Sequence, residues 1–235
     1  MRNIFRADHA LTPGYIRVIR ILIIIACNLM IVTAFANKII LLFINLFASA
    51  FLVISECLED YATYAGINLT NRNGILFFRA SSKGVTLIES ALKGDLVKLA
   101  IRVVLSTGAV NAVSILLSKS TKAMGAVLAA TAVAAFSFLV IVLIRMLSRS
   151  LNISRAVYYT VMGLMAYIGV GIIYAYVAVH FEEAAYPVMT TVDIIVLPVS
   201  LLLGVLISRY LVKRGVRGYM GGFADAKAED KEELV

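Results

Sequence analysis

Hydrophobic positions along the chain form long uninterrupted runs that short polar segments separate. Residues 21–36 and 123–144 contain no ionised side chain. An α-helix rises about 1.5 Å per residue, so about 20 apolar residues cross a hydrocarbon core of about 30 Å. Runs of this length and purity predict transmembrane helices.

The first apolar block, residues 21–55, is longer than one span requires, and it has three interpretations. We favour a helical hairpin, in which the break at 36–38 divides the block into two spans. One long helix is the main alternative, because Ala-Asn-Lys is a weaker turn signal than Gly or Pro. A signal peptide cleaved after residues 34–36 is the third, although another apolar span follows at once.

The polar segment 56–95 is the only long connection between apolar runs. Asn73-Gly74 is a tight-turn signal between two short stretches, 67–70 and 75–78, and it predicts a small β-hairpin. Further along, apolar residues recur at helical spacing, which predicts an amphipathic helix at the membrane interface that leads into the next span. These apolar positions are Val85, Ile88, Leu92, Leu96 and Leu99.

The whole pattern predicts an all-α polytopic transmembrane helix bundle with about six spans, folded as a single domain over residues 1–217. Small residues in the fourth and fifth spans, such as Ala130, Ala134 and Gly169, predict close packing between helices. Residues 218–235 are acidic and rich in small side chains, so we expect a solvated, mobile tail. The expected spans are 15–36, 39–55, 96–117, 123–144, 156–179 and 188–208.

Composition and charge support membrane residence and predict an orientation. Of the 235 residues, 61% are hydrophobic and 15% charged, whereas soluble domains average about 45–50% and about 25%. The net charge of +8 comes from basic residues at the ends of apolar runs, so no nucleic-acid site is evident. In the six-span arrangement sixteen Lys and Arg lie on one side and three on the other. We therefore expect a multi-pass protein of the cell membrane with both termini in the cytoplasm.

Asp193 is the only acidic residue deep inside an expected span, which makes it the first candidate for a functional group. Thr190 and Thr191 precede it, and Pro198 follows five residues later and frees a backbone carbonyl. Together these groups are suited to bind a cation or carry a proton. Alternatively, Asp193 simply pairs with a basic residue or a hydroxyl near the outer interface.

A second candidate is the acidic cluster of Glu56, Glu59 and Asp60. These residues follow the second span, and a continued helix would place them on one face. In an oligomer such a face forms an acidic ring that selects cations at a pore mouth. The alternative is an ordinary interfacial cap with solvated carboxylates.

Arg102 carries a charge about one turn inside the third span. Its long stem allows it to snorkel to the cytoplasmic interface, and an anion contact or an intramembrane ion pair is the alternative. His180 lies beside Glu182 and Glu183 in a short loop, which we interpret as an anionic turn in preference to a metal site.

No catalytic motif, phosphate-binding loop, haem ligand set or cysteine framework is recognisable, so we expect no enzyme, cofactor or resident metal. Two classes of function remain. The first is a small channel or transporter that moves an ion or small solute past Asp193. The second is a noncatalytic subunit of a larger membrane assembly, such as a translocation, DNA-transfer or respiratory machine. Its expected partners are the lipid bilayer and either copies of itself or other membrane subunits.

Overall fold

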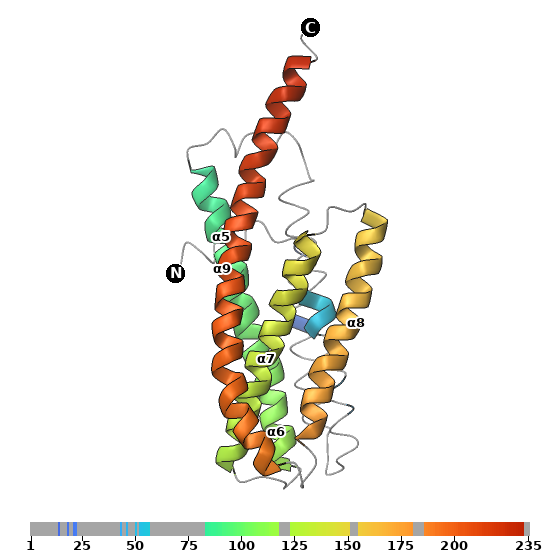
Figure 1. Cartoon of the computed structure of the whole chain (residues 1–235), viewed down its shortest axis with the longest axis vertical. Coiled ribbons are helices and arrows are strands. Elements are labelled where there is room, and N and C mark those ends of the chain that lie inside the picture. The colour runs from blue at the N-terminus through green and yellow to red at the C-terminus, as the bar shows by residue number, and fades with distance from the viewer. Residues whose placement is uncertain are drawn as a thin grey trace.

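The computed structural model of the chain describes a bundle of long helices (Figure 1). The described residues are 52–56, 83–117, 123–150, 155–180 and 186–232, together with positions 14, 18, 21, 22, 43, 46 and 50. No strand occurs among these residues, which confirms the all-helical class for this part of the chain. The expected β-hairpin at 67–78 and the break at 36–38 lie outside the described residues.

The longest described segments form four rods that alternate in direction (Figure 1). The first rod is α5, a π-helical turn η1 and α6 in direct succession, so the expected amphipathic helix and third span are one continuous element. Short connections lead to α7, α8 and α9, as the uncharged runs predicted. The bounds are α5 Gly84–Val103, η1 Val104–Gly108, α6 Ala109–Leu117, α7 Ala123–Ser150, α8 Arg155–Val179 and α9 Tyr186–Glu232.

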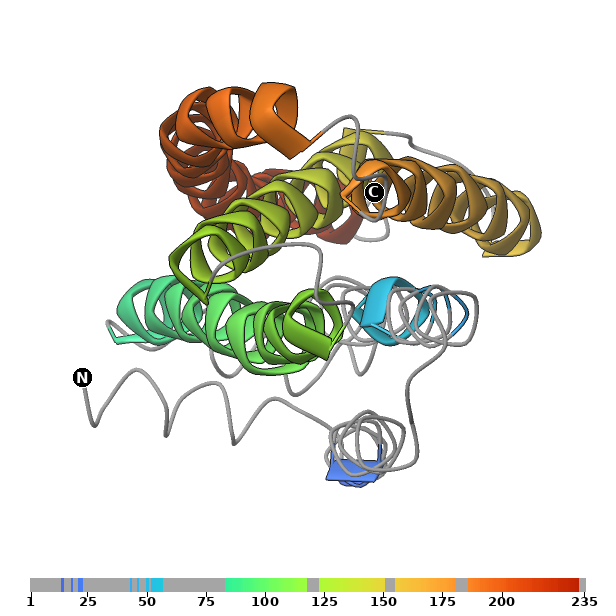
Figure 2. The ribbon, with the colours of Figure 1, turned by 90° about the horizontal axis from the view of Figure 1, so that it is seen from below.

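Helix α7 lies at the centre of the described bundle, with α8 and α9 on one side and α5–α6 on the other (Figure 2). Val133 and Ile141 of α7 are fully buried there. Ile173 of α8 and Leu211 of α9 belong to the same hydrophobic core. These buried branched side chains pack the helices against one another.

Glycines allow two of the helix crossings to be close. A Cβ atom at Gly204 of α9 would lie 2.8 Å from the ring of Phe138. One at Gly169 of α8 would lie 2.6 Å from Ile144. The close packing expected at Gly169 is therefore confirmed, whereas Gly163 on the same helix faces open space.

The apolar stripe of α5 packs inside the bundle. Ile88, Leu92 and Leu99 are buried, and a Cβ at Gly215 of α9 would lie 2.7 Å from Leu92. This partner exists because α9 does not end near residue 208 but continues to Glu232. The backbone of the expected tail is thus helical as far as that residue, in a sequence that contains no proline after Pro198.

Two helices are long and apolar enough to cross a membrane, namely Met124–Leu147 within α7 and Val188–Arg217 within α9. The apolar part of α8, Gly163–Val179, is shorter. The α7 segment is mostly buried, but α9 exposes large apolar side chains, with Ile194 at 60% and Leu202 at 63% exposure. A helix with this surface suits an apolar surrounding, so these helices support membrane association.

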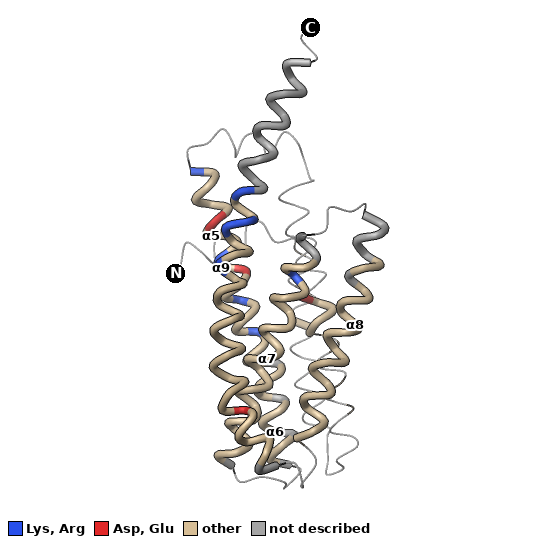
Figure 3. Tube along the Cα trace, in the orientation of Figure 1, with Lys and Arg blue, Asp and Glu red and all other residues tan. Residues whose placement is uncertain are grey.

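Charged residues of the described helices are distributed unevenly along the bundle (Figure 3). Lys and Arg lie towards the end where α5 begins and α7 ends. Asp193 belongs to the first part of α9, and α9 begins at the opposite end of the bundle (Figure 1). One buried polar cluster lies towards each of these two ends.

Candidate functional site

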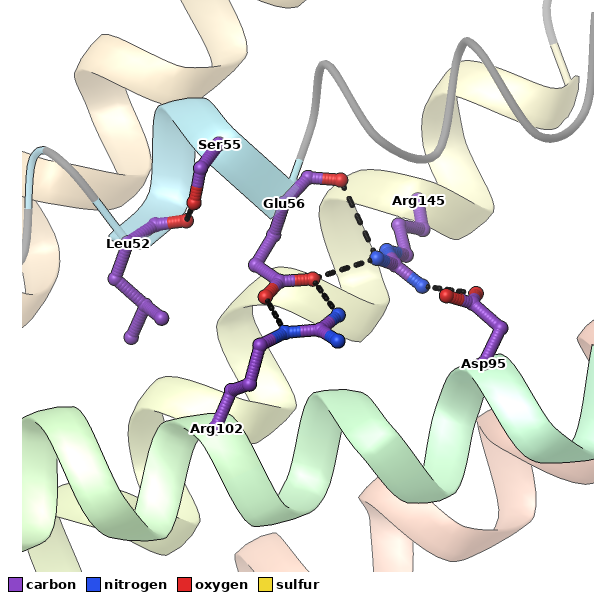
Figure 4. A network of polar contacts seen from close by, with 6 residues as sticks. All are labelled: Leu52, Ser55, Glu56, Asp95, Arg102 and Arg145. Carbon is purple, nitrogen blue, oxygen red and sulfur yellow. Dashed lines mark hydrogen bonds and ion pairs between the residues drawn. The ribbon is translucent and has the colours of Figure 1, made fainter. Parts of the chain in front are cut away.

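The first buried cluster, here called the arginine network, joins three segments of the chain near the basic end. It consists of Glu56 from the segment 52–56, Asp95 and Arg102 from α5, and Arg145 from α7 (Figure 4). Asp95 and Arg102 are seven residues apart, about two helical turns, so both side chains leave α5 on the same face. The network contains two cations and two anions and is therefore neutral overall.

Glu56 lies between the two guanidinium groups. Arg102 donates from Nε and Nη2 to its two carboxylate oxygens, the latter bond measuring 2.7 Å. Arg145 Nη2 donates to Glu56 Oε2 at 2.9 Å and to the Glu56 backbone oxygen at 3.2 Å. Arg145 Nη1 donates to Asp95 Oδ2 at 2.7 Å. Paired, hydrogen-bonded charges of this kind are the form in which ions are tolerated away from water.

The structure thus decides between two interpretations of Arg102, because it forms an ion pair with Glu56. Glu56 itself lies inside the bundle with a 2% exposed side chain. Glu59 and Asp60 lie outside the described residues. Arg145 was expected just beyond the fourth span, yet it is fully buried, because α7 continues past it to Ser150.

The second cluster, here called the histidine–aspartate site, lies at the other end, where α8 meets α9. His180 follows the last residue of α8, and Tyr176 is four residues earlier on the same face. Asp193 is about two turns into α9 and is 2% exposed. Helix α9 begins six residues after His180, and the carboxylate of Asp193 contacts both side chains.

The hydrogen bonds of this site define where protons must be. His180 Nδ1 lies 2.8 Å from the backbone oxygen of Tyr176, which only accepts, so Nδ1 carries a hydrogen. His180 Nε2 lies 3.0 Å from Asp193 Oδ2. A hydrogen bond there requires one further proton, on either the imidazole or the carboxyl group. The Tyr176 hydroxyl donates to Asp193 Oδ1.

Several influences act on the pKa of His180, which stands just beyond α8. Burial alone would lower this pKa, because it disfavours the charged imidazolium. The hydrogen bond to Asp193, the bond to the Tyr176 carbonyl and the negative charge of Asp193 outweigh burial. The pKa of His180 is therefore raised above its ordinary value of 6.5.

The remaining sequence candidates do not join this site through any contact described here. Thr190 is half-buried and Thr191 is exposed, about one turn before Asp193. Pro198 is exposed, and α9 continues through it. Asp193 itself accepts a hydrogen bond from the Tyr176 hydroxyl and contacts His180.

Sequence reasoning missed Tyr176, Asp95 and Arg145 as site residues and assigned His180 to a surface turn. The sequence did contain a signal for the partners of Asp193 in the histidine–aspartate site. Tyr176 and His180 have a spacing of four at the end of one span, and Asp193 follows near the start of the next. Within the described residues no group of three or more His, Cys, Asp or Glu side chains is placed to hold a metal. Glu182 and Glu183 lie outside those residues.

Comparison of the chain with protein-family models, with curated proteins and with solved structures gave no match. Functional assignment therefore depends on the geometry of the two clusters.

Proposed function

We propose that the chain is a non-enzymatic membrane transporter or channel of about six spans that moves a small ion in exchange for a proton at the histidine–aspartate site. Both termini lie in the cytoplasm. The apolar runs, the exposed apolar surface of α9 and the basic end of the bundle support this arrangement.

The observation that carries the proposal is the buried contact of 3.0 Å between His180 Nε2 and Asp193 Oδ2, which needs one proton to form a hydrogen bond. With Nδ1 bonded to a carbonyl oxygen, loss of that proton leaves neutral histidine beside a carboxylate. A net negative charge in a 2–3% exposed site needs compensation. A cation that enters when the proton leaves supplies it, and this replacement is the elementary step of exchange.

Flux through reconstituted liposomes tests the proposal. Purified protein is placed in vesicles that enclose a pH-sensitive dye, and NaCl, KCl or choline chloride is added outside. We expect Na⁺ or K⁺, but not choline, to make the interior more alkaline, because inward movement of the cation releases protons outward. Asp193→Asn removes the charge to be compensated and is expected to abolish this response.

Glu89→Gln is the matched control. It also removes one carboxylate, but the Glu89 side chain is 41% exposed and pairs with Lys93 on the same helix, so flux is expected to stay at the wild-type rate. Equal flux from wild-type protein and Asp193→Asn would contradict the proposal. Absence of any flux from folded protein that always purifies with other membrane proteins would favour the assembly-subunit class instead.

A further inference from the structure

An apolar groove runs along the described bundle between α5–α6, α7 and α9. Its volume is about 690 Å³, within the range of about 300–1,000 Å³ found for ligand sites. Ala100, Phe138 and Val205 line one end, and Ala112, Val127 and Leu197 line the other. Helices α5–α6 are antiparallel to α7 and α9. The lining residues therefore follow one another in order from one end to the other, and the groove is parallel to the helix axes.

The groove exists because its walls carry small residues. Gly108, Ala130 and Ala134 lie where larger side chains would fill the space. The π-helical turn Val104–Gly108 forms part of the same wall, and such turns are frequently found at functional sites. The close helix packing that the small residues predicted is present, and the groove lies beside these contacts.

The lining offers nothing polar to an occupant. Thr131 is the one lining residue with a polar side chain, and its hydroxyl donates within α7, to the backbone oxygens of Val127 and Leu128. The occupant must therefore be hydrocarbon along its whole length. From residue 100 to residue 112 the groove extends about 18 Å, close to half of a hydrocarbon core of about 30 Å.

The chemistry changes to basic at one end. Arg209 follows Val205 by one turn on α9, and Lys213 follows by a second turn. Both side chains are exposed. Basic residues at the membrane surface attract anionic headgroups, so the end of the groove near Val205 is complementary to a negative charge.

We propose that this groove holds one acyl chain of an anionic phospholipid, whose phosphate lies beside Arg209 and Lys213. The length of the groove matches one leaflet, its walls match hydrocarbon, and its basic end matches the headgroup. The inference rests on the proposed membrane residence of the chain and does not depend on ion exchange.

Native mass spectrometry in mild detergent, with phosphatidylglycerol or phosphatidylcholine added, tests the site. Wild-type protein is expected to retain one phosphatidylglycerol in preference to phosphatidylcholine. Ala109→Phe fills the groove from an exposed position on α6, and Thr131→Phe fills it from an exposed position on α7. Both are expected to lose that lipid. Ala175→Phe, an exposed alanine of α8 outside the groove, is the matched control and retains it.

Arg209→Gln separates headgroup from chain. This variant keeps the groove but is expected to reduce the preference for phosphatidylglycerol by about fivefold. Unchanged lipid retention in both filling variants would overturn the proposal. Dissociation of a dimer by these variants, without lipid loss, would overturn it in favour of a second copy of the chain as occupant. The measurement uses no ion gradient, so a failure of transport leaves its result unaffected.

Discussion

The arginine network and the histidine–aspartate site are both buried and both join different elements of the chain, but their charges behave differently. The arginine network is built on guanidinium groups, which as a class are cationic at every physiological pH. His180 has a raised pKa and shares one proton with Asp193. The network therefore has a fixed charge pattern, whereas the charge of the site depends on a single proton.

This difference assigns different roles to the two ends of the bundle. A network of fixed, paired charges specifies which segments lie together, and it holds Glu56 against α5 and α7. A site whose net charge changes with one proton has two states that a pH or cation gradient can select between. Substitutions in the two clusters are expected to change the stability of the protein by different amounts and with different pH dependence. Stability measurements therefore distinguish these roles.

The largest effect is expected at Arg145. Arg145→Met leaves Asp95 without this cation and Glu56 with one cation fewer, so the free energy of unfolding is expected to fall by about 3–5 kcal/mol. Denaturant titration in mild detergent measures the change. Arg217→Met removes an exposed arginine of α9 and is expected to stay within about 0.5 kcal/mol of wild type.

A second substitution sharpens this result. Asp95→Asn added to Arg145→Met neutralises the carboxylate that has lost this cation, so part of the lost stability should return. A loss below about 1 kcal/mol for Arg145→Met, the value typical of surface pairs, would show that the network does not hold the segments together.

An intermediate effect is expected from pH. Because folding raises the pKa of His180 above 6.5, its stabilising contribution is complete below pH 6.5 and is lost as pH rises through the folded pKa. Wild-type protein should therefore melt at a higher temperature at about pH 6 than at about pH 9. The bond at stake is charge-assisted and is typically worth about 1.5–3 kcal/mol.

His180→Gln isolates that contribution, because glutamine keeps a hydrogen-bonding side chain but does not titrate in this range. The melting temperature of the variant should depend less on pH than that of wild type, while other titrating groups act on both proteins alike. Identical pH profiles would show that the proton between His180 and Asp193 contributes nothing to stability.

The smallest effect is expected at Tyr176. Tyr176→Phe removes one donor to Asp193 and leaves the bonds of His180 in place, so a loss of about 0.5–1.5 kcal/mol is expected. Tyr167→Phe on the same helix is the control, because Tyr167 is 78% exposed. Equal unfolding free energies for the two variants would remove Tyr176 from the site.

Helix positions were predictable to a large degree. The uncharged runs predicted α7, α8 and the first part of α9, because a long apolar run has few stable alternatives to a helix. The helical backbone of the tail was harder to predict, because residues 209–232 contain no apolar run. Helix α9 nevertheless continues to Glu232, far beyond the expected span end at residue 208. The stripe of α5 was recognised from its spacing, but only the extended α9 supplies the surface on which Leu92 packs.

The candidate site was predictable only at single residues. Asp193 stood out because an acid inside an apolar run is costly wherever it packs. Its partner His180 is thirteen residues away in the preceding element, a spacing that no helix or strand period relates to Asp193. The partners within the arginine network are 46, 50 and 89 residues apart, and no local pattern relates them.

The sequence alone determined that the chain is apolar, helical and basic at the ends of its runs, because hydropathy and charge act along the chain itself. Only the tertiary structure decided which charges meet, since ion pairing depends on how helices pack and where each side chain leaves its helix. It also decided that Gly108, Ala130 and Ala134 line a groove, because only packing in three dimensions determines whether small residues bring helices into contact or leave a space between them.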